Sequence, residues 1–198
     1  MELNRRTPLH LRPWTPADRP AVAEALASPD MDRQFPLRSG NAERVDAWLA
    51  WASAMTEREH GFAFAVCAED DRPVASIAAA NIDAHDVAWV SYWATARARG
   101  LGFTGDALTA LVPWLHDAAG IWRLELGHRL DNPASGAIAA KAGFLQEGIE
   151  RGKLRYGGER YDTARWARLS DDPRPPAARA VTIAPASEPR ASGPGTGR

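Results

Sequence analysis

Residues 97–106 read RARGLGFTGD, and they separate the apolar run VAWVSYWA (87–94) from the segment ALTALVPWL (107–115). The first run has the composition of a strand, and the apolar residues of the second recur at the spacing of one helical face. Glycine lets a backbone turn sharply and approach a ligand, while the first turn of a helix carries unpaired N–H groups and a partial positive charge. The stretch therefore predicts an anion site, suited to a diphosphate, at a strand–helix junction.

The same glycines allow two other interpretations. Gly100, Gly102 and Gly105 match the Gly-x-Gly-x-x-Gly fingerprint of dinucleotide-binding enzymes letter for letter, which keeps a nucleotide-binding oxidoreductase as an alternative. Against it, we expect the preceding strand to belong to an antiparallel meander over residues 62–94, and no acidic residue ends a second strand about 20 residues further on. The other alternative is an ordinary glycine turn whose arginines only face water.

The chain around this junction has a mixed α/β pattern. Thr15–Asp18 reads as a capping-box start and predicts a helix to about Ala27. Asn132, followed by Pro133 and later by Gly143, predicts a second capped helix. Further helices are expected after residues 41 and 106, strands at 9–14, 62–70, 74–82, 90–94 and 122–128, and a closing hairpin at 144–151 and 159–169.

Composition limits the class of protein. The 198 residues are 45% apolar and 25% charged with a net charge of −1, which is typical of a globular protein and argues against broad binding to nucleic acid or membrane. Cys67 is the single cysteine, so no internal disulfide and no cysteine-rich metal site are expected. Because there is no secretory apolar segment at the start and no run of about 18 apolar residues, we expect a cytoplasmic protein.

The last part of the chain differs in composition from the rest. Six of the 15 prolines lie in residues 172–198, among Ala, Ser, Gly and Arg. Such a segment has little apolar surface to bury. We therefore predict one folded domain, residues 1–171, and a disordered tail, residues 172–198.

Three motifs resemble the GNAT acyltransferases, in particular their ribosomal-protein alanine N-acetyltransferase branch. The family signature Gln/Arg-x-x-Gly-x-Gly/Ala falls on Arg99, Gly102 and Thr104, where the threonine departs from Gly or Ala. The segment LRPWTPAD (11–18) is a second match. The third is similar to the branch's Asn-x-x-Ser, Lys-x-Gly-Phe and Glu-Gly, and it falls on Asn132, Ser135, Lys141, Gly143, Phe144, Glu147 and Gly148.

This resemblance covers about residues 9–168 and implies a fold. The expected fold is a mixed central sheet of about seven strands, with an antiparallel N-terminal meander, splayed fourth and fifth strands and about four flanking helices. It also implies acetyl-CoA or another acyl-CoA as co-substrate, and no metal. The residues expected to bind CoA are Tyr92, Trp93, Ala94, Arg99, Gly100, Leu101, Gly102, Phe103, Thr104 and Asn132.

The chemistry that the resemblance implies is direct attack of a neutral primary amine on the thioester. An N–H near Ala94 would stabilise the oxyanion. Where much of the family carries a proton-donating tyrosine this chain has Ala139, whereas the serine of the ribosomal-protein branch matches Ser135. Ser135 is therefore the expected catalytic residue. A purely structural role for Ser135 and Asn132, at the start of a capped helix, stays open.

The base is less defined by the sequence. Relatives often carry a glutamate where this chain has Trp89, and Asp83, His85 and Asp86 lie in the adjacent turn as candidates. An N-terminal amine, with a pKa near ~7.7, needs only a weak base.

The acceptor is expected to be a protein N-terminus or a small amine. Candidates to line its groove are Trp48 and Trp51 on one helix and Phe35 and Arg38 before it. Succinyl-CoA as donor is an alternative, since Arg38 could pair with an extra carboxylate. A CoA-binding protein with a degenerate catalytic site is another, and a homodimer is compatible with the sequence.

Overall fold

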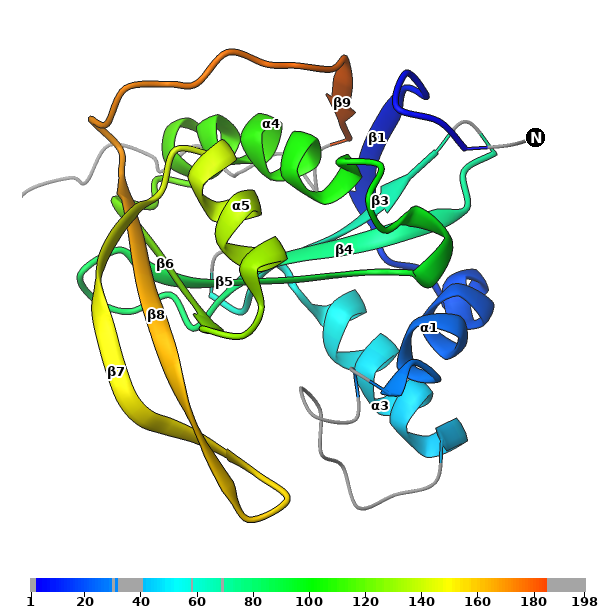
Figure 1. The fold of residues 1–198 in the computed structure, drawn as a ribbon. Helices are drawn as coiled ribbons and strands as arrows, with labels where there is room; N and C mark the ends of the chain where they lie inside the picture. Colours follow the sequence, from blue (N-terminus) through cyan, green and yellow to red (C-terminus); the bar gives the residue numbers. More distant parts are fainter. Residues whose placement is uncertain (1–2, 30, 32–40, 58, 69, 185–198) are drawn as a thin grey trace, which may run out of the picture.

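The computed structural model describes residues 3–29, 31, 41–57, 59–68 and 70–184 (Figure 1). The strands are β1 (Leu9–Pro13), β2 (Thr56–Glu57), β3 (Gly61–Cys67), β4 (Pro73–Ala80), β5 (Val87–Ala94), β6 (Arg123–Arg129), β7 (Leu145–Tyr156), β8 (Glu159–Leu169) and β9 (Val181–Ile183). The helices are α1 (Arg19–Leu26), α3 (Asn41–Ala54), α4 (Phe103–Asp117) and α5 (Pro133–Lys141), with short 3-10 turns η1 (Pro16–Asp18) and η2 (Ala96–Ala98).

The strands form a single mixed sheet. Their order is β7-β8-β6-β5-β4-β3-β1-β9, and β2 pairs with β3, which makes nine strands in the described residues. β3, β4 and β5 are consecutive antiparallel neighbours, which confirms the predicted meander, whereas β5 pairs with β6 in parallel. The mixed α/β fold is thus confirmed. The strands beyond the seven expected are the two-residue β2 and β9, which comes from the predicted tail.

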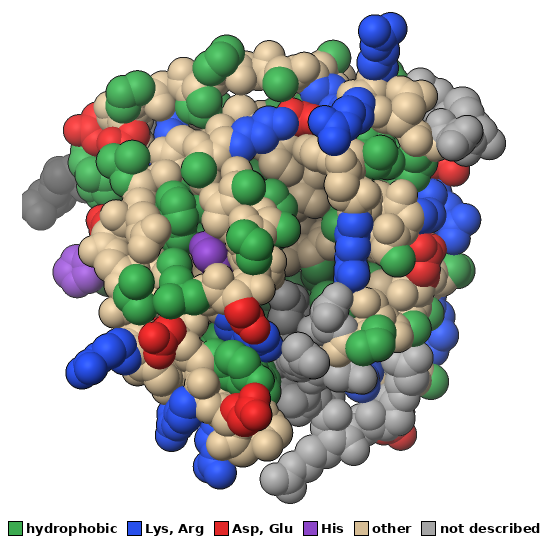
Figure 2. Space-filling view, viewed as in Figure 1, with side chains coloured by type: hydrophobic (Ala, Val, Ile, Leu, Met, Phe, Trp, Pro, Cys, Tyr) green, Lys and Arg blue, Asp and Glu red, His purple; other side chains and the backbone are tan. Residues whose placement is uncertain are grey.

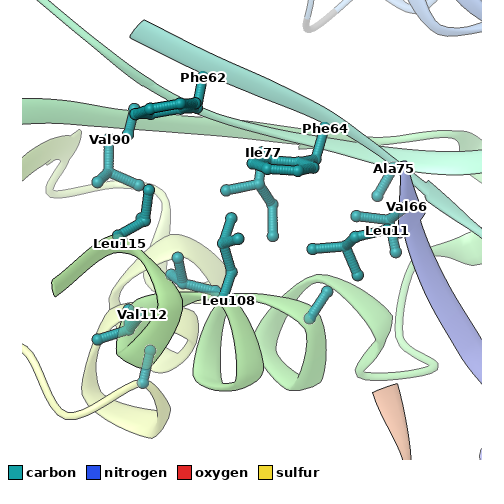
Figure 3. Packing of buried hydrophobic residues seen from close by; sticks show 14 of the residues in the cluster. Leu11, Phe62, Phe64, Val66, Ala75, Ile77, Val90, Leu108, Val112 and Leu115 are labelled. Atoms are coloured by element: carbon teal, nitrogen blue, oxygen red, sulfur yellow. The ribbon is translucent and has the colours of Figure 1, made fainter. Parts of the chain in front are cut away.

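Helices cover both faces of the sheet. α4 and α5 lie on one face and α1 and α3 on the other (Figure 1). The alternation in β3 fits this layering, because its large residues Phe62 and Phe64 join the cluster under α4, while the small Ala63 and Ala65 join the cluster under α1 and α3. Figure 3 shows Phe62, Phe64 and Ile77 of the sheet above Leu108, Val112 and Leu115 of α4.

The carboxyl-terminal segment departs from the prediction. Residues 172–184 lie against the body of the protein instead of being disordered, and β9 pairs in parallel with β1, with Val181 opposite Leu9. Arg174 bonds to Asp117 at the end of α4. Composition failed here because a three-residue strand needs little apolar surface of its own when the edge of β1 is available to pair with it. Residues 185–198 lie outside the described residues.

Within the described part of the chain, no helix has the length and apolar character needed to cross a bilayer.

Candidate active site

The two central strands separate in the middle of the sheet. β5 and β6 pair only through Val87–Trp89 and Arg123–Glu125. β5 stays paired with β4 as far as Ala94, and β6 stays paired with β8 as far as Arg129, so each strand continues while the gap between them opens. From residue 90 onward the edge of β5 that faces β6 is therefore available to an extended ligand.

The residues predicted to bind the pantetheine arm lie on this open edge. Side chains alternate along β5, so Tyr92 faces α5 and Trp93 faces α3. The Tyr92 hydroxyl donates to the Ser135 carbonyl at 3.0 Å, and burial raises the pKa of Tyr92 to about 12. The Trp93 ring is buried against Trp14 and Trp48. Because the Trp93 ring is buried and the Tyr92 hydroxyl is bonded to α5 at the edge of the opening, the main chain of this segment is the part that offers hydrogen bonds to a ligand in the gap.

The glycine-rich stretch forms the turn into α4. Gly100 and Gly102 have positive φ values of 76° and 80°, which are readily adopted only by glycine. Gly102 is the N-cap of α4 and provides no side-chain cap. The first α-helical bond runs from the Asp106 N–H to the Gly102 carbonyl at 3.0 Å. The amides of residues 103–105 precede it and lack an acceptor within the helix, so they offer N–H groups to an anion.

The side chains around this turn make contacts that the sequence does not predict. Phe103 and Thr104 are buried, so their main chain rather than their side chains serves the turn. Arg99, expected beside the diphosphate, directs Nη2 to the Ser28 hydroxyl at 3.0 Å, just after α1. A different cation lies at the start of α4, because Lys141 Nζ is 2.6 Å from Asp106 Oδ1.

Lys141 belongs to the Lys-x-Gly-Phe motif, and the sequence predicts no role for it at the site. A Cβ added to Gly105 would lie 3.1 Å from the Lys141 side chain, and one added to Gly102 would lie 3.9 Å from its Nζ. Because these two glycines have no side chains, Lys141 at the carboxyl end of α5 can lie close to the first turn of α4. Figure 2 shows the surface hollowed between α5 and the loop that leads into α4, with basic side chains at the upper rim of the hollow.

The first turn of α5 lies at the same opening. Asn132 is the N-cap, and its Oδ1 accepts from the Ser135 N–H at 3.3 Å. Its Nδ2 donates to Ser135 Oγ at 3.1 Å. The structural role left open for Asn132 is therefore present. For Ser135 the contact has a chemical consequence: Oγ receives a hydrogen bond from the amide and keeps its own proton for another acceptor.

The candidate bases lie away from the open part of the strands. Asp83, His85 and Asp86 form the turn before β5, next to its paired end. The Asp83 carboxylate accepts from the main-chain N–H groups of His85 and Val87, and these bonds lower its pKa. The Asp86 carbonyl accepts from the N–H groups that start β6. These hydrogen bonds hold the turn in place and keep the start of β6 beside β5.

The acceptor side is described in part. Trp48 is buried in the aromatic cluster with Trp14 and Trp93, while Trp51 is 37% exposed on the same helix. Phe35 and Arg38 lie outside the described residues.

A separate cluster of potential metal ligands lies where β1 and the end of β3 meet the turn between β3 and β4. Among the described residues, the ligand atoms of His10, Cys67 and Asp71 lie within 4.8 Å of one another. Asp71 already accepts from Arg12 at 2.7 Å, and burial raises the pKa of the Cys67 thiol to about 12. Neither property favours a cation, and the cluster takes no part in the opening between β5 and β6.

Comparison with known proteins agrees with this geometry. The family model described as "Acetyltransferase (GNAT) domain" matches residues 8–145. The chain belongs to the GNAT acetyltransferase family. A comparison with curated proteins finds no match.

Solved structures share the GNAT fold with this chain at low identity. A GNAT-family acetyltransferase from Bacillus anthracis has a TM-score of 0.74 at 17% identity, covering 87% of this chain and 100% of its own. A ribosomal-protein-S5-alanine acetyltransferase from Vibrio fischeri has 0.71 at 19%, covering 84% and 94%. A spermidine N-acetyltransferase from Vibrio cholerae, solved with CoA and spermine, has 0.72 at 15%, covering 83% and 96%. Membership of the GNAT family removes the dinucleotide oxidoreductase alternative, and the antiparallel β4–β5 pairing gives the structural reason.

Proposed function

We propose that this protein transfers an acyl group, namely acetyl, from acyl-CoA to a primary amine by direct attack on the thioester. The observation that carries the proposal is the opening between β5 and β6, with the first turns of α4 and α5 beside it. A thioester with an extended arm and a diphosphate fits this arrangement, because the open strand edge offers amide pairing and the start of α4 offers N–H groups to the anion.

The residues proposed to bind CoA fall into groups according to the part of CoA that each contacts. The main chain of Tyr92, Trp93 and Ala94 pairs with the amides of the pantetheine arm. The N–H groups of Arg99 and Leu101 already donate to the Ala96 and Ala98 carbonyls, so the amides proposed to hold the diphosphate are those of Gly100 and residues 102–104. Gly100 and Gly102 keep that approach clear of side chains. Lys141 adds a positive charge beside Gly102.

Catalysis is assigned to groups that touch the reacting atoms. An N–H near Ala94 donates to the thioester carbonyl as negative charge develops there, a contribution on the order of 3 kcal/mol when well aimed. Ser135 donates its proton to the leaving thiolate, assisted by the hydrogen bond that Oγ accepts from Asn132. The proton that the attacking amine loses on forming the amide returns to Ser135 through solvent water, so the serine is regenerated. The amine attacks the thioester in its neutral form. An N-terminal amine, with an unperturbed pKa of ~7.7, reaches that form without a strong base.

The acceptor is proposed to be a protein N-terminus or a small amine. The neighbours named for ribosomal protein S5 alanine and for spermidine span this same range. The resemblance of the Asn132–Ser135 motif to the ribosomal-protein branch favours the N-terminus. Succinyl-CoA as donor stays an alternative.

The proposal is tested by incubating the protein with acetyl-CoA and a panel of N-terminal peptides and polyamines, reading thiol release and the mass of the products. Acceptor-dependent thiol release with a mass gain of one acetyl group is the expected result. A parallel arm with succinyl-CoA identifies the donor. CoA binding without turnover on any acceptor would favour the degenerate CoA-binding protein instead.

A further inference from the structure

Arg179 lies in the segment that was expected to be disordered, yet its side chain is only 7% exposed. Its Nε lies 2.9 Å from Asp106 Oδ2, and its Nη1 donates to the Thr7 carbonyl at 2.6 Å. Its Nη2 donates to the Leu101 carbonyl at 3.2 Å, and its guanidinium carbon lies 4.7 Å from the centre of the Phe103 ring. Three of these four partners belong to the turn into α4.

The register of β9 delivers this side chain to the turn. β9 begins two residues later, and its pairing with β1 is extended by the Leu9 N–H, which donates to the Ala180 carbonyl at 3.4 Å. Arg179 is thus fixed beside the start of β1, where Thr7 lies. The whole segment falls after residues 8–145, the part matched by the family model.

The bond to Leu101 orients an amide of the proposed diphosphate site. In a trans peptide the carbonyl and the following N–H point in opposite directions. Holding the Leu101 carbonyl toward Arg179 therefore turns the Gly102 N–H away from the tail. At the other end of the chain, Arg5 acts on the preceding peptide, since its Nη2 donates to the Gly100 carbonyl at 3.2 Å.

Arg179 also balances a charge that would oppose the ligand. Asp106 is buried in the first turn of α4, next to the amides that would receive a diphosphate. The Asp106 carboxylate and a diphosphate bound to these amides are both negative, and like charges repel strongly where water is excluded. Lys141 and Arg179 together pair with both Asp106 oxygens and give the cluster a net charge of +1.

We propose that Arg179 is a positioning residue for acyl-CoA binding, which orients the 100–103 turn and neutralises Asp106, so that the carboxyl-terminal segment 172–184 is part of the co-substrate site. This inference rests on the proposed function. It assigns no bond to the substrate itself and acts through Leu101, Phe103 and Asp106.

The test compares Arg179→Ala with Arg174→Ala in the full chain, with isothermal titration of CoA. Arg174 is the matched control, because it lies on the same segment but bonds to Asp117 at the far end of α4 and is 52% exposed. We expect R179A to weaken CoA binding by about tenfold, equal to ~1.4 kcal/mol, and R174A to leave it unchanged. Arg179→Lys keeps the charge but not the three-way donation, so it should fall between wild type and R179A, and it serves if R179A does not fold.

Two readouts separate positioning from general destabilisation. Hydrogen exchange of the amides of residues 100–104 should accelerate in unliganded R179A while β3 and β4 keep their protection. The kcat/KM with S-acetylpantetheine, which lacks the diphosphate, should match wild type. Equal losses with acetyl-CoA and S-acetylpantetheine, or an unchanged CoA affinity in R179A, would overturn this inference alone. A wild-type protein that does not bind CoA would overturn the proposed function as well.

Discussion

Two helices begin at the opening between β5 and β6, and their first turns differ. α4 starts at Gly102, which has no side chain to satisfy the first amides. α5 starts at Asn132, which accepts from the Ser135 N–H and donates to the Ser135 hydroxyl. The first arrangement leaves N–H groups for an external anion. The second satisfies an amide internally and directs a hydrogen bond to the hydroxyl that we propose as the proton donor. Under the proposed function, one structural feature, a helix N-terminus, would bind charge in one place and support proton transfer in the other.

The largest effect is expected from giving α4 the side chain that it lacks. A Cβ on Gly102 lies 3.6 Å from Asp106 Oδ2 and 3.9 Å from Lys141 Nζ, so a branched residue fills the space beside the first turn. Its φ of +80° adds backbone strain. We expect Gly102→Val to abolish CoA binding in isothermal titration while circular dichroism shows the fold retained.

A matched control separates strain from the lost site. Gly157, in the hairpin between β7 and β8, also has a positive φ, +56°, with nothing within 4 Å of an added Cβ. Gly157→Val should bind CoA like wild type at a similar cost of ~1–2 kcal/mol in stability. If Gly102→Val still binds CoA, the diphosphate lies elsewhere.

The next effect concerns the donor at α5. Ser135→Ala removes the hydroxyl and keeps the main-chain cap, so we expect kcat to fall at least about tenfold, toward the low end of general acid catalysis. CoA affinity should change little. Steady-state kinetics and CoA titration measure the two quantities. An unchanged kcat would reduce Ser135 to a helix-start residue and remove the contrast with α4.

Asn132 allows its two bonds to be separated. Asn132→Ala should lower the free energy of unfolding in urea by about 1 kcal/mol through loss of the cap. Asn132→Asp keeps an oxygen for the Ser135 N–H but lacks the N–H donor to Ser135 Oγ. We expect Asp to preserve stability and still lower kcat. Wild-type kcat in this variant would show that the Asn132 donation does not assist Ser135.

The smallest effect is expected at Tyr92, which links β5 to α5 across the opening. Tyr92→Phe loses the bond to the Ser135 carbonyl, worth about 1 kcal/mol of unfolding free energy. Because Ser135 is then less firmly placed, kcat should fall by less than in Ser135→Ala. Tyr161→Phe is the control, since that hydroxyl bonds to Glu159 on the exposed hairpin. A larger kcat loss than in Ser135→Ala would make the Tyr92 hydroxyl the better candidate donor.

The sequence predicted the elements around these two helices because their signals are local. Antiparallel neighbours joined by short turns, such as β3, β4 and β5, follow from the order of apolar runs and polar turns. The start of α5 followed from the Asn-Pro pair, and the turn into α4 from its glycines. These features depend on residues a few positions apart.

The rest depends on contacts between distant residues. Arg99 bonds to the Ser28 hydroxyl, and Asp106 is paired with Lys141 and Arg179. No local pattern specifies those pairings. The ordering of residues 172–184 has the same origin, because it depends on the edge of β1, where Leu9 lies opposite Val181, 172 residues later in the chain.

The pairing of β9 with β1 has a practical consequence for work with this protein. Cutting the chain at residue 171, where composition suggested a boundary, would leave a shorter form that retains α4, α5 and the gap between β5 and β6. That form would have a bare sheet edge prone to self-association. Its Asp106 would keep Lys141 as a partner but lose Arg179. Truncation for crystallisation, or a fusion partner joined close to β9, is therefore expected to weaken binding of the diphosphate part of CoA as well as to change solubility.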